Sequence, residues 1–257
     1  MFVDLDNLYL SDELKAVRRS IRRYVEEKIV PNGDVWEEQG YIPRVIFREM
    51  GELGFLSMSF PESVGGAELG ALSSLILSEE LGRSTYGGVM ASISVHADMS
   101  ASHLARHGNP ALIEQYMPSI INGAKVCAVA VTEPGAGSDV ARLKTKAEKV
   151  GDRWVINGSK MFITNGVHGD LFMVAARTDP DAKGSRGISL FVVEKGTSGF
   201  TTSEPLKKTG WLSSDTAQLF FDDVEVPETH LIGEVNKGFY YVMEGFQLER
   251  ICIGGQV

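Results

Sequence analysis

The chain has 257 residues and a formal net charge of −9, and 43% of its residues are apolar. This composition is ordinary for a globular protein, and the length suits one large or two modest domains. The negative charge argues against nonspecific nucleic-acid binding and against docking on an anionic membrane, and no apolar run approaches the ~20 residues of a membrane-spanning helix. Residues 1–6 are acidic and lack the basic start of a secretory or mitochondrial leader. We therefore expect no nucleic-acid partner, no membrane insertion, and a cytoplasmic location, or the mitochondrial matrix for a mature eukaryotic form.

Residues 1–123 have the pattern of helices. Ser11 is a predicted N-cap with Asp12 and Glu13 in the first turn, and apolar residues then recur at helical spacing up to Pro31, which is expected to end the helix. Further helices are predicted over residues 43–54, 72–81, 89–107 and 110–122. Together they predict an N-terminal all-α domain.

Residues 124–235 contain short β-favouring runs separated by Gly, Asn, Asp and Pro. The predicted strands are 126–132, 144–150, 154–157, 161–164, 171–178, 188–194 and 217–226. Gly151 and Asp152 predict a two-residue hairpin turn. The connections are too short for helical crossovers, and no strand is followed by GxGxxG, so an antiparallel β-barrel domain is expected rather than a Rossmann sheet.

After Pro227 the pattern returns to helix. Asn236 is a predicted N-cap, and Phe239, Met243 and Phe246 follow at steps of three and four. We expect residues 236–257 to be the first helix of a C-terminal helical domain whose remainder is missing from this chain. The predicted fold class is therefore α+β and multidomain.

Neither the cysteines nor the histidines predict a special site. Cys127 and Cys252 stand in apolar surroundings, which predicts buried free thiols. His96, His103 and His107 have a spacing that metal ligands on a helix can have, but no carboxylate or Cys cluster accompanies them. We expect no metal, and we expect these histidines in the core or at a helix end.

The most informative stretch is residues 129–139, where an apolar strand stops at a polar, Gly-rich loop. Gly135 and Gly137 lack a Cβ, so a ligand can approach their backbone, and the amides of residues 135–138 could line an anion- or carbonyl-binding concavity. Thr132 and Ser138 add hydroxyls that donate and accept. By composition alone, an ordinary Gly/Pro turn is the favoured interpretation.

The whole string changes that interpretation, because it resembles the first signature of the acyl-CoA dehydrogenase family, flavoenzymes that desaturate acyl-CoA thioesters. Residues 157–166 resemble the family's second flavin-contacting strand, residues 215–227 resemble its barrel-closing strand, and residues 60–66 resemble its N-terminal loop. The segments occur in family order. The chain is therefore identified as a member of this family, most similar to its long-chain and isovaleryl branch.

The resemblance implies FAD as the cofactor. The implied cofactor-binding residues are Val129, Ala130, Val131, Thr132, Glu133, Pro134, Gly135, Ala136, Gly137, Ser138, Phe162, Ile163 and Thr164. Thr132 and Thr164 would bond the edge of the isoalloxazine ring. Phe162 stands where the family often has Trp, so it would cover the ring face without an N–H donor.

The resemblance also implies a catalytic base. Dehydrogenation needs a base for the α-proton, a hydride acceptor at the β-carbon and donors for the developing enolate oxygen. In the long-chain and isovaleryl branch the base is a Glu followed by Arg, which here is Glu249 before Arg250. A desolvated site would raise the pKa of Glu249. A base in the missing C-terminal domain is the alternative, and a Glu-Arg dipeptide alone would indicate only a solvated helix face.

Ser138, Tyr240, Gln247 and Arg250 are the implied substrate-binding residues, with Ser138 near the pantetheine and the Arg250 guanidinium suited to phosphate or carbonyl oxygens. Tyr240 and Glu249 are nine residues apart, which places them half a turn out of phase on a straight helix. Both can touch one ligand only if the helix bends near Gly245 or if the ligand wraps past the start of the helix.

The implied activity is FAD-dependent oxidation of an acyl-CoA to a trans-2-enoyl-CoA, with an electron-transfer flavoprotein as acceptor and a homodimer or homotetramer as the full-length assembly. The alternatives are a flavin oxidase or monooxygenase of the same fold, a nucleic-acid-associated relative, which the charge of −9 disfavours, and a non-catalytic fragment. We expect the 257-residue polypeptide alone to be inactive. The sequence does not specify the acyl chain length.

Overall fold

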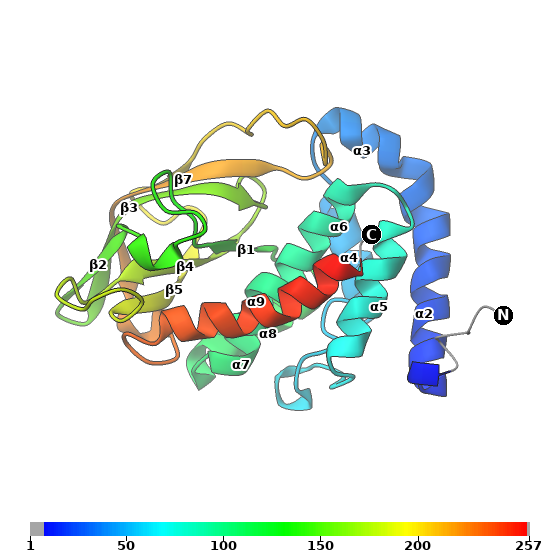
Figure 1. Cartoon of the computed structure of the whole chain (residues 1–257), viewed down its shortest axis with the longest axis horizontal. Helices are drawn as coiled ribbons and strands as arrows, with labels where there is room; N and C mark the ends of the chain where they lie inside the picture. The colour runs from blue at the N-terminus through cyan, green and yellow to red at the C-terminus, as the bar shows by residue number, and fades with distance from the viewer. Residues whose placement is uncertain (1–7, 256–257) are drawn as a thin grey trace.

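A computed structural model describes residues 8–255 of the chain. The acidic start, residues 1–6, and the last two residues of the predicted C-terminal segment, Gln256 and Val257, lie outside the described residues. Helices form one side of the molecule and a β-sheet the other, and one long helix near the C-terminus crosses from the sheet to the helices (Figure 1). No helix within the described part is long and apolar enough to cross a membrane.

The helical side begins as the sequence predicts and then departs from it. The Ser11 hydroxyl accepts a hydrogen bond from Leu14 N at 3.2 Å, which confirms the N-cap. Pro31 does not end the helical run: the chain continues through a π-helical turn and a 3₁₀ turn into a further helix. Pro31 lies in the first turn of the 3₁₀ segment, where its missing N–H breaks no internal hydrogen bond. The helical elements are α2 (Asp12–Tyr24), η1 (Val25–Ile29), η2 (Val30–Asn32), α3 (Gly33–Gln39), α4 (Arg44–Glu52), η3 (Glu62–Val64), α5 (Ala71–Gly82), α6 (Gly87–Ser94), η4 (Val95–Ala101), α7 (Ser102–His107) and α8 (Pro110–Ile121).

Eight strands form one sheet, in the order β6-β7-β3-β2-β4-β5-β8, with β1 paired to β4. The strands are β1 (Cys127–Ala130), β2 (Lys146–Val150), β3 (Arg153–Thr164), β4 (Leu171–Arg177), β5 (Ile188–Glu194), β6 (Phe200–Thr202), β7 (Thr216–Pro227) and β8 (Leu231–Ile232), with short 3₁₀ turns at η5 (Val140–Arg142) and η6 (Glu228–His230). The runs 154–157 and 161–164 belong to one bulged strand, and the short strands β6 and β8 were not predicted.

The predicted antiparallel barrel is not confirmed. Within residues 8–255 no ladder joins the outer strands β6 and β8, so the sheet is open. The sheet is also mixed, because β1 runs parallel to β4 along its whole length. A parallel neighbour requires a long connection rather than a hairpin, and here the chain between β1 and β4 contains the β2–β3 hairpin.

The central strand β4 separates two apolar cores. Leu171 and Met173 pack with the helices, whereas Phe172 and Val174 pack on the other face of the sheet with β3 and β7. All four side chains are fully buried. Alternation along a strand sends successive side chains to opposite faces, so β4 has no solvent-facing side and its sequence is continuously apolar.

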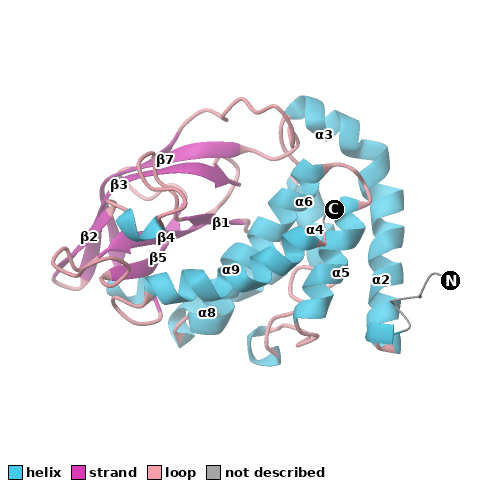
Figure 2. Cartoon of the chain, viewed as in Figure 1, coloured by secondary structure: helices cyan, strands magenta, loops and turns pink. Residues whose placement is uncertain are grey.

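The crossing helix is α9 (Gly238–Gly254), a single α-helix that contacts β5 at one end and α5 at the other (Figure 2). The predicted Asn236 cap is wrong. Asn236 adopts a positive φ of 67°, its side-chain oxygen accepts from the Thr178 hydroxyl at 2.6 Å, and its N–H donates to the Ser189 hydroxyl at 2.7 Å. These bonds anchor the chain before α9 to the ends of β4 and β5. Within α9, Gly245 lies against His103, where a Cβ would stand 2.5 Å from the ring carbon Cε1.

The two cysteines are free and buried, as predicted. The three histidines also serve the fold: His96 accepts from Cys127 N, His103 packs against α9, and the His107 ring stacks on Tyr241 at 4.0 Å between centroids.

Candidate active site

A cleft of about 190 Å³ lies where the ends of β1 and β3 face η4 and α9. Its lining residues are Val95, Met99, Val129, Val131, Thr132, Phe162, Ile163, Thr164, Phe246 and Glu249. The structure thus brings together six of the predicted cofactor residues and the predicted base. These residues come from three segments that are far apart in the sequence.

Thr132 closes the end of β1 against β3. Its hydroxyl donates to Met161 O at 2.5 Å, and Met161 N donates to Thr132 O at 2.9 Å. The hydroxyl hydrogen is therefore used within the protein. The lone pairs of the hydroxyl oxygen remain, so at this position Thr132 can accept a hydrogen bond from a ligand.

Phe162 stands in the cleft because β3 is irregular there. The register between β3 and β7 shifts between Lys160 and Ile163, and Phe162 itself has a positive φ of 62°. A bulge re-aims the side chain that it carries, and the Phe162 ring is 66% exposed although it belongs to a strand. An aromatic ring at this edge can cover one face of a planar ligand.

The Gly-rich loop forms a tight turn, with Glu133 N donating to Ala136 O at 2.9 Å and Ala136 N donating back to Glu133 O at 3.1 Å. Among the described residues nothing lies within 4 Å of the position that a Cβ would take at Gly135 or Gly137, so a ligand can approach both. Pro134 and Ser138 are exposed on this loop, outside the lining of the cleft.

The Glu133 side chain points away from the cleft and into the protein. Its carboxylate accepts from Lys160 Nζ at 2.8 Å, Lys144 N at 2.6 Å and Thr145 N at 2.9 Å. Burial acts to raise the pKa of Glu133, but Lys160 and the hydrogen bonds outweigh it and hold the pKa below its usual value. Glu133 is therefore a buried anion behind the cleft wall. Ala130, also fully buried, contributes to the core.

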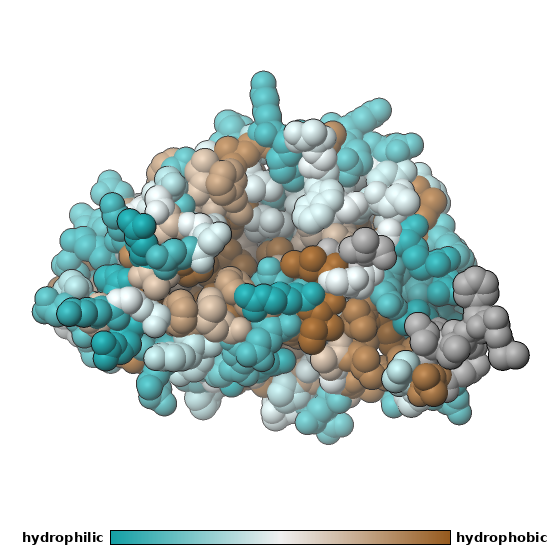
Figure 3. All heavy atoms as spheres, in the orientation of Figure 1, coloured by the Kyte–Doolittle hydropathy of each residue, from teal (hydrophilic) through white to brown (hydrophobic). Residues whose placement is uncertain are grey.

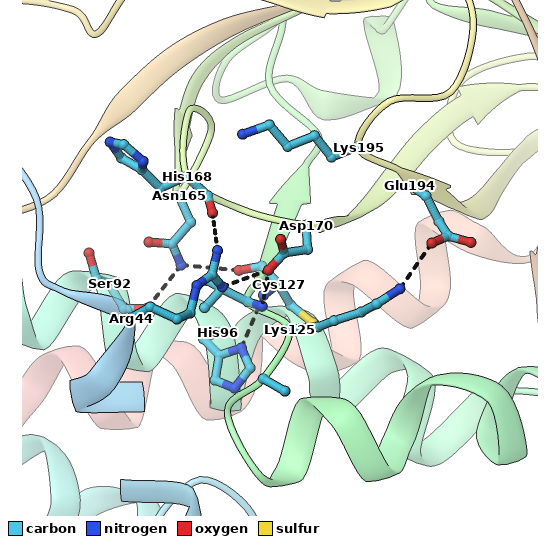
Figure 4. A network of polar contacts seen from close by, with 12 residues as sticks. Arg44, Ser92, His96, Lys125, Cys127, Asn165, His168, Asp170, Glu194 and Lys195 are labelled. Carbon is cyan, nitrogen blue, oxygen red and sulfur yellow. Dashed lines mark hydrogen bonds and ion pairs between the residues drawn. The ribbon is translucent and has the colours of Figure 1, made fainter. Parts of the chain in front are cut away.

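Strand β1 is held in place by the helical side of the molecule (Figure 4). Cys127 N donates to His96 Nδ1 on η4 at 3.0 Å. The Asn165 amide donates both to Cys127 O and to Ser92 O on α6, each at 3.0 Å. Asn165 follows Thr164 directly, so its side chain connects the end of β3 to the first residue of β1 and to α6.

An ionic network anchors the approach to β1 (Figure 4). Arg44 on α4 donates to an Asp170 carboxylate oxygen at 2.6 Å, and the same oxygen accepts from Val126 N at 2.7 Å. Lys125 pairs with Glu194 at the end of β5 at 3.0 Å. The chain that enters β1 is thereby fixed to both the helices and the sheet.

Glu249 reaches the cleft from α9. Burial raises the pKa of Glu249, and the neighbouring Arg250 acts in the opposite direction. The surroundings on this side are apolar: Phe246 lies one turn earlier on α9, and Val95 and Met99 project from η4. A carboxyl group with a raised pKa in an apolar cleft has the properties of a general base that works near neutral pH.

Gln247 and Arg250 are exposed and lie outside the lining of this cleft. Tyr240 lines a second, larger hollow of about 690 Å³ near the start of α9. The Tyr240 ring is 50% exposed, with Lys237 Nζ 5.7 Å from its centroid. Three cations border this hollow, Lys183, Arg186 and Lys237, together with two acids, Asp179 and Asp181.

Three residues of the cleft were not predicted from sequence: Val95, Met99 and Phe246. Residues 89–107 were predicted as one helix packed tightly by small residues. The structure instead inserts the π-helical turn η4 between α6 and α7. Hydrophobic periodicity cannot reveal such a turn, although π-turns are frequent at functional sites.

The fold and cleft define a protein of helical and β layers in which a crossing helix brings a carboxyl group to two strand ends. Residues 11–124 match the family described as acyl-CoA dehydrogenase, N-terminal domain, and residues 128–224 match acyl-CoA dehydrogenase, middle domain. The chain belongs to the acyl-CoA dehydrogenase family, which confirms the resemblance.

Individual relatives agree with the predicted branch. The chain is 39% identical to the mitochondrial isovaleryl-CoA dehydrogenase of Pongo abelii over 96% of its length, and 40% identical to the mitochondrial long-chain specific acyl-CoA dehydrogenase of Rattus norvegicus over 95%. It spans 59% and 56% of these two relatives. The crystal structure of an acyl-CoA dehydrogenase from Geobacillus kaustophilus matches with a TM-score of 0.91 at 42% identity, covering 96% of this chain and 65% of that one.

Proposed function

We propose that the protein is an FAD-dependent acyl-CoA dehydrogenase and that Glu249 is the base that removes the α-proton of the thioester. The observation that carries this proposal is the cleft in which Glu249 faces the ends of β1 and β3. The family to which the chain belongs is FAD-dependent. We also propose the domain boundaries: residues 1–123 form the N-terminal helical domain, residues 124–235 the middle β domain, and residues 236–257 the first helix of a C-terminal helical domain.

The residues of the cleft suit one face of a flavin. Val131 and Ile163 offer an apolar surface, Phe162 stands at its edge, and Thr132 and Thr164 place hydroxyls beside it. The open space at Gly135 and Gly137 admits a ligand to the loop backbone. When bound, the flavin supplies the acceptor for the β-hydride.

Glu249 would hold the abstracted α-proton on its carboxylate. Burial brings the pKa of Glu249 closer to that of the weakly acidic α C–H group. The apolar side chains around Glu249 would exclude water from the reacting carbons. Proton removal at Cα and hydride loss at Cβ leave the trans-2-enoyl thioester. Val95, Met99 and Phe246 would contact the acyl chain.

The acyl-CoA would lie along α9. Tyr240 and Glu249 are nine residues apart, a rise of about 13 Å on an α-helix, which an extended pantetheine arm can span. Because α9 is a single α-helix from Gly238 to Gly254, we favour a ligand that wraps past the start of the helix over a bend at Gly245. Tyr240 and the cations of the larger hollow would then meet the nucleotide end, and Ser138, Gln247 and Arg250 remain proposed contacts at the rim.

The remaining parts of the proposal follow the family. Electrons would pass to an electron-transfer flavoprotein, and the intact protein would be a homodimer or homotetramer. The two curated relatives compared above are named as mitochondrial enzymes, so a eukaryotic version would work in the mitochondrial matrix and a bacterial one in the cytoplasm.

The test is anaerobic bleaching of the flavin in the full-length parent protein by acyl-CoAs of different chain length, with Glu249→Gln as the variant. General-base catalysis contributes about 10²- to 10⁴-fold, so Glu249→Gln should bleach at least about 100-fold more slowly while it retains FAD.

Glu244→Gln is the matched control, because Glu244 lies on the same helix, outside the cleft, and pairs with Arg106. Its bleaching rate should equal that of the unsubstituted protein. Normal bleaching by Glu249→Gln would show that the base lies elsewhere, and rapid reoxidation by oxygen would favour the oxidase alternative.

A further inference from the structure

Behind the cleft wall lies a buried ion pair that takes no part in the chemistry described above. Lys160 on β3 is 0% exposed, and its Nζ lies 2.8 Å from a Glu133 carboxylate oxygen and 3.0 Å from Val131 O. Burying a lysine is costly unless its charge is paired and hydrogen-bonded. Both conditions are met at this position.

The pair is tied to the backbone that faces the cleft. Val131 and Thr132 line the cleft, whereas Lys160 and Glu133 do not. Lys160 holds the carbonyl of Val131, and Met161, the next residue along β3, holds Thr132 through two hydrogen bonds. The three residues 131–133 are thus each bonded to residues 160–161.

We propose that the Lys160–Glu133 pair positions the flavin-facing wall and sets the local charge against which the flavin is reduced. The proposal rests on the proposed function, since it requires FAD to bind in this cleft. Lys160 and Glu133 are positioning residues, because neither lines the cleft. The cation fixes the Val131 carbonyl, and the anion neutralises the cation in the protein interior.

Both groups carry charge at neutral pH. Burial lowers the pKa of Lys160 to about 8, opposed by Glu133, so the ammonium is still protonated at pH 7. The Glu133 carboxylate also accepts from Lys144 N and Thr145 N. Hydrogen bonds to a carboxylate stabilise its charged form, so these two amides favour the ionised form of Glu133 together with Lys160, against the effect of burial.

Removing one charge or the other is predicted to shift the flavin reduction potential in opposite directions. Reduction of the flavin adds negative charge to the ring, which a nearby anion opposes and a nearby cation favours. Lys160→Met leaves Glu133 uncompensated and should lower the flavin reduction potential. Glu133→Gln leaves Lys160 uncompensated and should raise it. The double variant removes both charges and should return close to the original value.

The experiment measures the midpoint potential of bound FAD, and the dissociation constant of FAD, for the full-length protein and its three variants from pH 5 to pH 8. The pH is varied because Glu133 raises the pKa of Lys160, so Glu133→Gln moves the protonation of Lys160 to lower pH. Lys160→Met should also bind FAD about tenfold more weakly, because the Val131 carbonyl loses its buried partner. Lys146→Met is the control, since Lys146 pairs with Glu148 on the exposed surface of β2, and it should change neither quantity.

Glutamine at position 133 keeps a carbonyl oxygen that can accept from Lys160 Nζ, and the double variant buries no charge. The comparison of Glu133→Gln with the double variant therefore holds even if Lys160→Met fails to fold. Shifts of the two single variants in the same direction, or no shift in either, would overturn the charge role. Failure of the unsubstituted protein to bind FAD would overturn the proposed function as well, which distinguishes the two.

Discussion

Asn165→Ala should destabilise the protein, because it removes a buried amide that joins a helix to the sheet. The Asn165 side chain is 2% exposed and donates to two buried carbonyls, Ser92 O on α6 and Cys127 O on β1. Each of the two lost hydrogen bonds costs about 1 kcal/mol. Asn165 also has a positive φ of 58°, which costs alanine about 1 kcal/mol more. The expected loss is about 3 kcal/mol.

Asn165→Gly separates the two contributions. Glycine accepts the positive φ without strain, so it should lose only the hydrogen-bonding part, about 2 kcal/mol. Asn157→Ala is the matched control, because Asn157 bonds Asp223 at 2.9 Å in a solvent-accessible position where water can replace the amide. Its loss should stay below about 1 kcal/mol.

The assay is equilibrium unfolding in urea, followed by tryptophan fluorescence, with the midpoint and slope compared among the variants. A loss for Asn165→Ala no larger than that of Asn157→Ala would refute the reasoning, since the two carbonyls would then not depend on the amide. Equal losses for the alanine and glycine variants would refute only the contribution from the positive φ.

Two further predictions concern the buried histidines. Burial lowers the pKa of His96 and His103 to about 4, and burial raises that of Asp98 to about 6. As the pH falls below 6.5, both histidines become protonated in the unfolded state but stay neutral in the folded state. Below pH 6, Asp98 becomes protonated in the folded state but stays ionised in the unfolded state. Stability should therefore fall between pH 6 and pH 4 by about 1.4 kcal/mol per pH unit, for one net proton, and a urea midpoint that rises on acidification would contradict this. Gly245→Ala should cost about 1–3 kcal/mol, because its Cβ would meet the buried His103 ring at 2.5 Å; Gly254→Ala, on the same helix with open space around it, should gain up to about 1 kcal/mol, and equal effects would contradict the packing argument.

Local sequence patterns correctly predicted much of the secondary structure. Ser11 caps α2 as its side chain and the acidic first turn predict, and the apolar runs after residue 124 locate six of the eight strands. The cap and the strands depend on short segments, whose composition reflects local structure directly. The motif at residues 129–139 and the Glu249-Arg250 dipeptide each contribute residues to one cleft, but they pointed to a site only through the family resemblance, because their composition alone indicated a turn and a solvated helix face.

The errors have a common cause, which is that tertiary contacts override local rules. Asn236 has the composition of a helix cap, but Thr178 and Ser189 occupy its polar groups. Pro31 normally stops a helix, but it stands where a 3₁₀ turn begins. The mixed sheet depends on β1 joining β4 in parallel, a pairing between residues more than 40 positions apart that no local pattern encodes.

One side of the cleft is the wall formed by the ends of β1 and β3, and the other is the helix α9. The two sides are held in place by different interactions. The wall is bonded from the helical side through His96 and Asn165 and from the sheet side through Lys160. Within residues 8–255 Glu249 has no such bonds, so its place depends on how α9 packs, and Gly245 against His103 is one close contact there. Substitutions in the wall should therefore act on flavin binding, whereas substitutions at Gly245 should act on proton abstraction by moving Glu249 along with its helix.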